Sequence, residues 1–174
     1  MAKHRILPFP DANVGEVLGL VEIIYAYGGK SKISFIAEEL RMELDDLGDV
    51  VDMAELLGLV KVKNGIIQLS VYGEALNLGT IEDKKRILRK QLLNLEPFKT
   101  VVALIKKEVE VDEREIVNHL KVNHIIDDLS RFHKLFLSWG GYAEIIEYDG
   151  KKQRFRIPKP QEIEQNTDEE NGEE

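Results

Sequence analysis

A helical apolar stripe that runs into a hairpin signal occurs twice in this chain, and the repeat limits the fold more than any other feature. The first stripe ends at residues 57–60 and is followed by an Asn-Gly dipeptide at 64–65, which suits a tight β-hairpin turn. The second stripe ends at 139–141 and is followed by Asp-Gly at 149–150. A helix followed by a two-stranded ribbon, in both halves, predicts two winged-helix units in tandem. Because such units present a helix and a hairpin to a partner, the pattern favours recognition over catalysis.

The predicted fold class is mainly α with small β-hairpins (α+β), arranged as tandem winged-helix units joined by a helical bridge. We expect the first unit at residues 1–79, the bridge at 80–96 and the second unit at 97–160. Residues 161–174 are acidic and nearly free of apolar side chains, so they cannot offset the entropy of ordering. We predict that this tail is disordered.

The first unit is predicted from its helix signals. Apolar residues from Val14 follow helical spacing until Gly28 and Gly29, which supply a left-handed helix end. Ser34 is expected to cap a short second helix that runs to about residue 41. The third helix carries apolar side chains on one stripe, namely Leu47, Val50, Val51, Ala54 and Leu57.

The bridge and second unit carry similar signals. Thr80 with Asp83 resembles a capping box that opens a helix to about residue 93, and Pro97 suits the first turn of the next helix. Asp112 with Glu115 is expected to cap a further helix. A long helix after Asn123 is predicted from a second apolar stripe, Ile125, Leu129, Phe132, Phe136 and Trp139. Strands at 143–148 and 151–157 should complete the unit, with the turn at Asp149 and Gly150.

Composition is that of a globular protein and narrows the chemistry. The 174 residues are 43% hydrophobic and 32% charged, and there is no cysteine. Disulfides, thiolate metal sites and thiol nucleophiles are therefore excluded. No apolar run approaches the roughly 18 residues that a membrane span needs, and the start lacks the apolar region of a signal peptide. We expect a cytoplasmic protein that does not insert into a membrane.

Charge is distributed unevenly along the chain. Residues 1–80 carry 7 basic and 12 acidic side chains, residues 81–157 carry 16 and 13, and residues 158–174 carry 1 and 7. A protein that binds duplex DNA gains most of its affinity from Lys and Arg against phosphates. The acidic first unit lacks that contribution, so nucleic-acid binding is a question for the second half.

The spacing of the candidate catalytic and metal-binding residues does not match the motifs that they resemble. Gly29-Lys30-Ser31 resembles the end of a phosphate-binding loop, but Ile24 stands where that loop needs a glycine and a helix stands where it needs a strand. His119, His124 and His133 are separated by five and nine residues, not by the four that would place helical ligands on one ion. We therefore expect no enzyme activity, no cofactor and no metal site.

Two sets of basic residues are candidates for contact with a partner or with nucleic acid. One lies on the bridge helix and comprises Lys84, Lys85, Arg86, Arg89 and Lys90. The other lies on the last helix and hairpin and comprises Arg131, Lys134, Lys151, Lys152, Arg154 and Arg156. Both sets also have a structural explanation that involves no partner. The basic residues of the bridge helix could form a solvated helix face or pair with the acidic first unit. The basic residues of the hairpin could simply keep an edge strand from aggregating.

The third helix of the first unit would enter the groove if this unit bound DNA. Its polar face carries only acidic side chains, namely Glu43, Asp45, Asp46, Asp49, Asp52 and Glu55. These carboxylates would face phosphate with no cation among them. Insertion of this helix into a DNA groove is therefore predicted not to occur.

Several short segments resemble one known family, and the similarity covers roughly residues 5–157. The segments are LPFP at 7–10, IAEEL at 36–40, AELLGLV at 54–60, and WGGYAE at 139–144 with YD at 148–149. They resemble the AAA-associated C-terminal domain, best known as the region that follows the ATPase domain in nitrate, sulfonate and taurine type ABC transporter ATP-binding proteins, and also as separate archaeal chains. The resemblance implies an accessory or regulatory module that acts on a transporter ATPase. No ATPase motif is present here, so it implies no nucleotide-binding residue.

The sequence thus predicts a non-catalytic protein-interaction module. The resemblance implies a transporter ATPase as its partner, and self-association into a homodimer is compatible with this prediction. The alternative is a winged-helix transcription regulator that touches DNA through the second unit.

Overall fold

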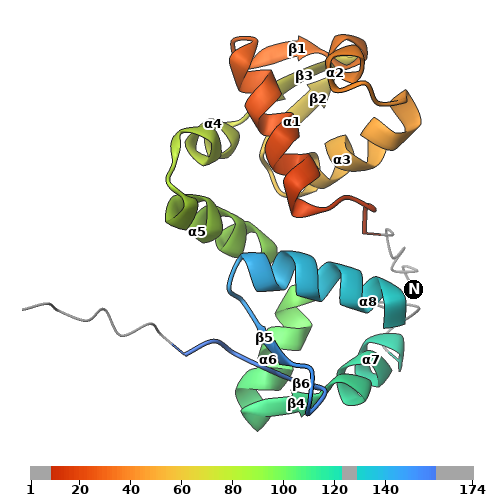
Figure 1. Ribbon diagram of the computed structural model, residues 1–174, viewed down its shortest axis with the longest axis vertical. Coiled ribbons are helices and arrows are strands. Elements are labelled where there is room, and N and C mark those ends of the chain that lie inside the picture. The colour runs from red at the N-terminus through yellow and green to blue at the C-terminus, as the bar shows by residue number, and fades with distance from the viewer. Residues whose placement is uncertain (1–8, 123–128, 160–174) are drawn as a thin grey trace, which may run out of the picture.

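The computed structural model describes residues 9–122 and 129–159, which form two units, one above the other in Figure 1. The first unit contains α1 (Val14–Ala26), β1 (Lys30–Lys32), α2 (Ile33–Leu40), α3 (Leu44–Leu56), β2 (Val60–Lys63) and β3 (Ile66–Leu69). The bridge contains α5 (Ile81–Leu92), and α4 (Val71–Leu78), which falls in the range expected for the first unit, leads into it. The second unit contains α6 (Phe98–Glu108), β4 (Glu110–Asp112), α7 (Glu113–Val122), α8 (Leu129–Leu135), η1 (Phe136–Gly140), β5 (Glu147–Asp149) and β6 (Arg154–Arg156). The predicted class, mainly α with small β elements, is confirmed.

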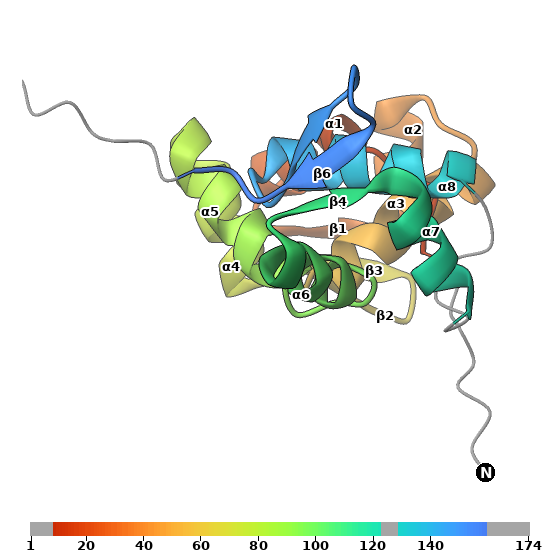
Figure 2. The same ribbon diagram turned by 90° about the horizontal axis from the view of Figure 1, so that it is seen from below.

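Both units have the same order of elements: helix, strand, helix, helix, strand, strand. Each holds an antiparallel three-stranded sheet, with strand order β1-β3-β2 in the first and β4-β6-β5 in the second. Seen from below, β4 lies beside β6, with α6 and α7 close by (Figure 2). The sequence predicted the hairpins but missed β1 and β4, because strands of three residues show no measurable alternation.

The first hairpin forms as predicted. Asn64 and Gly65 both have positive φ, 51° and 72°, which is the conformation of a two-residue turn that matches the twist of its strands. Val62 pairs with Ile67, and Ile67 is fully buried. The lysines that alternate with the valines of β2 point the other way and are exposed.

The predicted turn of the second hairpin is wrong. Asp149 pairs with Arg154, so the loop holds the four residues 150–153. The Asp149 carboxylate accepts hydrogen bonds from the backbone N–H groups of Lys151 and Lys152 at 3.0 and 3.1 Å, and this side-chain bonding replaces the two-residue turn. The strands are also shorter than predicted, because Ala143 and Glu144 lie in a turn with φ of 53° at Glu144.

The predicted helix starts have mixed outcomes. The capping box of Thr80 and Asp83 is confirmed, and Asp112 accepts a hydrogen bond from the backbone N–H of Arg114 at 2.9 Å. The predicted cap at Ser34 is wrong, since α2 begins at Ile33 directly after Lys32. Because β1 leads directly into α2, the N-cap position is Lys32, whose side chain makes no capping hydrogen bond.

The long helix predicted after Asn123 is described from Leu129 onward. It continues from α8 into η1, a π-helical segment whose Phe136 and Trp139 are both buried as the stripe predicted. The part of the prediction at Ile125 lies outside the described residues, as do His124 and the acidic tail at 161–174.

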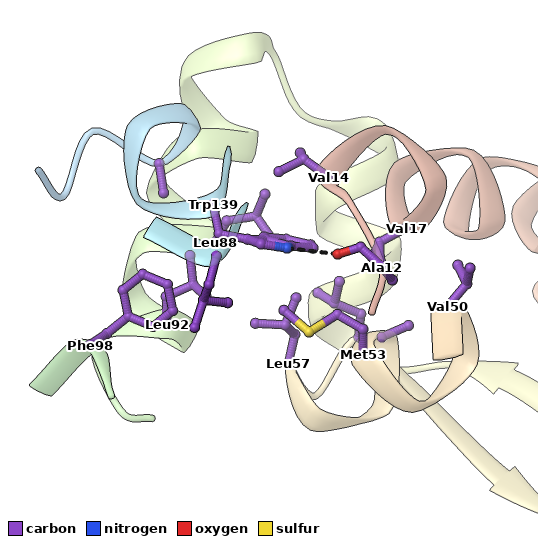
Figure 3. Close-up of a cluster of buried hydrophobic side chains, with 14 of the residues drawn as sticks. Ala12, Val14, Val17, Val50, Met53, Leu57, Leu88, Leu92, Phe98 and Trp139 are labelled. Carbon is purple, nitrogen blue, oxygen red and sulfur yellow. Dashed lines mark hydrogen bonds between the residues drawn. The ribbon is translucent and has the colours of Figure 1, made fainter. Parts of the chain in front are cut away.

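The buried side chains of the two units form one cluster. The indole Nε1 of Trp139 in η1 donates a hydrogen bond to the carbonyl oxygen of Ala12, just before α1, at 2.9 Å (Figure 3). The ring of Phe9 lies beside that of Phe98 of α6 in a tilted arrangement, with centroids 6.2 Å apart and an interplanar angle of 58°. The lead-in segment at 9–13 precedes α1 of the first unit and packs against the second unit, so it joins the two.

Candidate functional site

Helix α5 carries the densest group of basic side chains and lies between the two units (Figure 1). It starts at the capping box: the Asp83 N–H donates to the Thr80 hydroxyl at 3.2 Å, and the Thr80 N–H donates to the Asp83 carboxylate at 3.0 Å. The Thr80 hydroxyl also donates to the Asp83 carboxylate at 2.8 Å, and this bond, followed by the bond from the Thr80 N–H, lowers the pKa of Asp83. Leu88 and Leu92 are fully buried on the opposite side from the exposed Arg86. The capping box therefore stabilises the N-terminus of α5, and the buried leucines anchor its apolar face in the core.

Two of the basic side chains of α5 bind the second unit rather than solvent. Lys85 Nζ lies 2.6 Å from Glu144 Oε1, and Arg89 Nη2 lies 2.9 Å from Glu144 Oε2. Arg89 Nε also donates to the carbonyl oxygen of Ala143 at 2.7 Å. The hydrogen bond from Lys85, together with the charges of Lys85 and Arg89, lowers the pKa of Glu144, and the same hydrogen bond raises the pKa of Lys85. We call Lys85, Arg89 and Glu144 the bridge clamp.

The other three basic residues of α5 are engaged to different degrees. Arg86 forms an ion pair with Asp83 at 2.5 Å while its side chain stays 75% exposed. Lys90 Nζ lies 5.9 Å from the centroid of the Tyr72 ring, within the range of a cation–π contact. Lys84 has no ion pair among the described residues. The five basic residues of α5 therefore do not form one unpaired positive surface, because Lys85 and Arg89 are paired with Glu144 in the bridge clamp.

The second hairpin mixes paired and unpaired cations. Arg156 binds Glu147 at 2.7 Å, and Arg154 lies 3.8 Å from Glu110 on the neighbouring strand β4. Lys151 and Lys152 are exposed in the loop and have no ion pair within residues 9–122 and 129–159.

The two basic residues predicted on the last helix are placed differently. Lys134 forms an ion pair with Asp11 of the lead-in segment, so it helps to join the units. The side chain of Arg131 lies outside the described part of the molecule. In the described part of the molecule the predicted basic residues thus pair with different carboxylates: Lys85 and Arg89 with Glu144, Lys134 with Asp11, and Arg156 with Glu147.

Helix α3 shows solvent an acidic face. Its apolar stripe is buried, with Leu47, Met53 and Ala54 fully inaccessible, and the opposite face carries the carboxylates at 43, 45, 46, 49, 52 and 55, all exposed. None of these carboxylates forms an ion pair among the residues that the structure describes. Glu55 accepts the backbone N–H of Val62 at 3.0 Å.

One buried carboxylate was not predicted. Glu113, the first residue of α7, is only 5% exposed. One of its oxygens accepts the hydroxyl of Tyr148 at 2.7 Å, which raises the pKa of Tyr148, and the other contacts Nε2 of His133. The three side chains come from α7, α8 and β5, so they hold the second hairpin against the helices. In the sequence Glu113 is indistinguishable from the acidic residues common in first helical turns.

The remaining sequence candidates are dispersed. Lys30 and Ser31 lie in β1 and pair with Gln68 and Ile67 of β3. Within the described ranges no group of three or more His, Asp or Glu side chains is arranged to hold a metal ion. No helix in that part of the chain is both long and apolar enough to cross a membrane.

Comparison with known proteins gives one match. A family model described as the C-terminal AAA-associated domain matches residues 35–149, which covers most of both units and the whole bridge. No curated protein and no solved structure matches the chain.

Proposed function

Because the chain belongs to the C-terminal AAA-associated domain family, we propose that it is a non-catalytic accessory module that regulates a protein partner, with an ABC transporter ATPase as that partner. The observation that carries the proposal is the exposed face of α3, which holds six carboxylates and no cation. In a winged-helix arrangement this helix would be the one placed against a target. An acidic face of this kind suits a basic protein surface and repels phosphate.

The use of the basic residues supports the same proposal. Lys85 and Arg89 are bound to Glu144, and Lys134 is bound to Asp11. A nucleic acid that bound these groups would have to break contacts that join the bridge helix and the lead-in segment to the second unit. Their role is better explained as fixing the relative position of the units, so that the module presents one rigid surface.

The proposed regulatory role is tested by ATP hydrolysis of a candidate partner. A purified transporter ATP-binding subunit from the same genome should change its hydrolysis rate when this chain is added, and the chain alone should release no phosphate. A variant with Asp45, Asp49 and Asp52 changed to Lys should lose the effect, whereas a variant with Glu22, Glu38 and Glu108 changed to Lys, all exposed and outside that face, serves as a charge control. Equal potency of the acidic-face variant and the wild-type protein would rule out the proposed surface.

A second candidate function, DNA binding through the second hairpin, is favoured by one observation: Lys151 and Lys152 are exposed and have no ion pair among the described residues. Phosphate-driven affinity falls steeply as salt rises. We expect no sub-micromolar binding of a fluorescent duplex at physiological salt in an anisotropy titration. Tight, salt-sensitive binding that is lost in Lys151→Ala/Lys152→Ala, but not in the matched hairpin variant Lys61→Ala/Lys63→Ala, would replace our proposal with this one.

A further inference from the structure

One face of the first sheet carries a group of lysines that strand pairing brings together. Lys30 of β1 and Lys61 of β2 both pair with Gln68 of the central strand β3. Lys32 of β1 and Lys63 of β2 both pair with the residue at position 66 of that strand. Paired residues of an antiparallel sheet point to the same face, and so do residues two apart along a strand, so these side chains share one face. We define the lysine face by its six residues, namely Lys30, Lys32, Lys61, Lys63, Ile66 and Gln68.

The opposite face of this sheet belongs to the core, so the lysine face is turned to solvent. Ile67, which lies between Ile66 and Gln68, is fully buried, and Val60 and Leu69 are buried beside it. Helices α1 and α3 contact the sheet. On the lysine face the four lysines and Gln68 are exposed, and Ile66 is half-buried. The sheet also lies away from the second unit (Figure 1), so this face is accessible to a partner.

The lysine face carries four positive charges without a counter-ion. Strands β1, β2 and β3 contain no Asp or Glu. None of the four lysines forms an ion pair with another described residue. From strand geometry their Cα atoms mark the corners of a rectangle of about 7 by 10 Å. Four of the seven basic residues at 1–80 lie here, so the net negative charge of the first unit does not extend to this face.

Protection of the sheet edges is not enough to explain this arrangement. Lysines on edge strands do prevent pairing with another chain. However, β1 is only three residues long, and on the edge of β2 the backbone N–H of Val62 already donates to the Glu55 carboxylate at 3.0 Å. Like charges that share one sheet face repel one another. A group of four without an internal counter-ion therefore suits an anion from outside the chain.

We propose that the lysine face binds the anionic surface of a phospholipid bilayer, as a peripheral contact. Each lysine close to anionic lipid adds to the attraction. Because salt screens charges beyond roughly 10 Å, the four lysines at the surface outweigh the net charge of −8 on the whole chain. The aliphatic stems of the lysines, and Ile66 between Lys32 and Lys63, supply apolar surface to the headgroup region.

A nucleic acid fits the lysine face less well than a bilayer does. None of its six residues is aromatic, so it offers no side chain on which bases could stack. The major groove of DNA admits a helix or a two-stranded ribbon, and the face of a three-stranded sheet is too broad to enter it. A bilayer is wide enough to meet all four lysines at once.

The first test is flotation of the full chain with vesicles made of equal parts of phosphatidylglycerol and phosphatidylcholine. The wild-type chain should bind these vesicles at about 0.1 M salt, bind less as salt rises, and not bind phosphatidylcholine alone. Changing the four lysines of the lysine face to Gln should weaken binding at least about a hundredfold, since one lysine contributes about fivefold. A wild-type chain that does not bind the anionic vesicles overturns the proposal.

The matched control changes four exposed lysines of the second unit to Gln, namely Lys99, Lys106, Lys107 and Lys121. This control variant and the lysine-face variant have the same net charge. The control should bind within about threefold of wild type, because charges far from the lipid are screened. Equal losses in both variants would show that only net charge matters, and would overturn the proposal. Circular dichroism of each variant verifies that the fold is retained.

Two further measurements distinguish the bilayer from other assignments. Single-stranded and duplex oligonucleotides at the same phosphate concentration should bind the chain more weakly than the anionic vesicles do. Tighter binding of either, lost in the lysine-face variant, would make this a nucleic-acid surface and not a lipid surface. Vesicle binding that is lost in Lys151→Gln/Lys152→Gln and kept in the lysine-face variant would place the contact on the second hairpin.

The lipid proposal does not rest on the proposed regulatory role. The lysine face and the acidic face of α3 share no residue, and the ATP hydrolysis assay contains no vesicles. Failure of one proposal therefore leaves the other as it stands.

Discussion

Gly73 is the residue whose replacement the structure excludes most firmly. A Cβ at this position would lie 2.2 Å from the carbonyl oxygen of Leu59 and 3.1 Å from a methyl carbon of Leu69. The backbone of the hairpin approaches α4 closely because no side chain intervenes there. This glycine is explained by contact between elements and not by an unusual φ.

We therefore expect Gly73→Ala to destabilise the protein by roughly 1 to 3 kcal/mol, since the clash is with backbone that cannot move aside. Gly48→Ala is the matched control within a helix. Its Cβ meets nothing within 4 Å, so the better helix propensity of alanine should stabilise the fold by up to about 1 kcal/mol. Urea unfolding measures the change in the free energy of unfolding for each variant. The two variants should change it in opposite directions, and destabilisation of equal size in both would contradict this explanation.

Individual residues were predictable where the cause is local. Asn64 and Gly65 adopt positive φ because of their own chemistry, and Trp139 is buried as its position on an apolar stripe implied. The burial of Glu113 was not predictable, because its partners Tyr148 and His133 are distant in sequence. The same holds for Glu144 as the counter-ion of Lys85 and Arg89.

At the scale of elements, the bridge clamp fixes α5 on the turn that follows η1. Lys85 and Arg89 lower the pKa of Glu144 below its usual value of 4.5. A carboxyl group whose pKa is lower in the folded state stabilises the fold above that usual value, and the contribution is lost as pH falls through the lowered pKa. The clamp should therefore weaken only in acid.

Glu144→Gln should lower the free energy of unfolding by about 1 kcal/mol at neutral pH, a size typical of partly exposed ion pairs. The difference from wild type should shrink as pH falls below 4.5. Glu38→Gln on α2 is the control, as Glu38 is exposed and forms no ion pair within the described residues. Chemical unfolding of the three proteins from pH 7 to pH 3 provides the measurement; a difference that stays constant over this range would show that the charge of Glu144 plays no part.

Elements were predicted best where periodicity is long. The apolar stripe from Leu47 to Leu57 correctly predicted the helix α3, which spans Leu44–Leu56 with Leu57 as its C-cap, and all five residues of the stripe are buried. The strands β1 and β4 were missed because each has only three residues and gains its stability from a neighbouring strand. The loop of the second hairpin was mispredicted because the Asp149 side chain bonds two backbone N–H groups.

At the scale of the whole molecule, Trp139 holds the units together. Its ring lies against Ala12 and among side chains of α3 and α5 (Figure 3). We expect Trp139→Ala to destabilise the chain by about 3 to 5 kcal/mol, because a large buried ring is removed from a core shared by both units. Trp139→Phe retains most of the apolar volume and loses the bond to Ala12, so its cost should be smaller.

Far-UV circular dichroism during urea unfolding measures both changes. If Trp139→Ala unfolded with the stability of wild type, the ring could not be buried at the junction. A transition of Trp139→Ala in two separate steps would further indicate that this residue couples the two units.

The helix stripes, the first hairpin, the capping box at Thr80 and the acidic face of α3 follow from the sequence alone, because each depends on neighbours within about a turn of helix or a turn of hairpin. How these elements pack together follows from long-range contacts. These contacts pack residues 9–13 against the second unit, bury Glu113, and set Lys85 and Arg89 on Glu144. The same packing leaves the outer face of α4 apolar and uncovered. Contacts between residues far apart in sequence depend on the packing of the whole chain, and no local pattern encodes them.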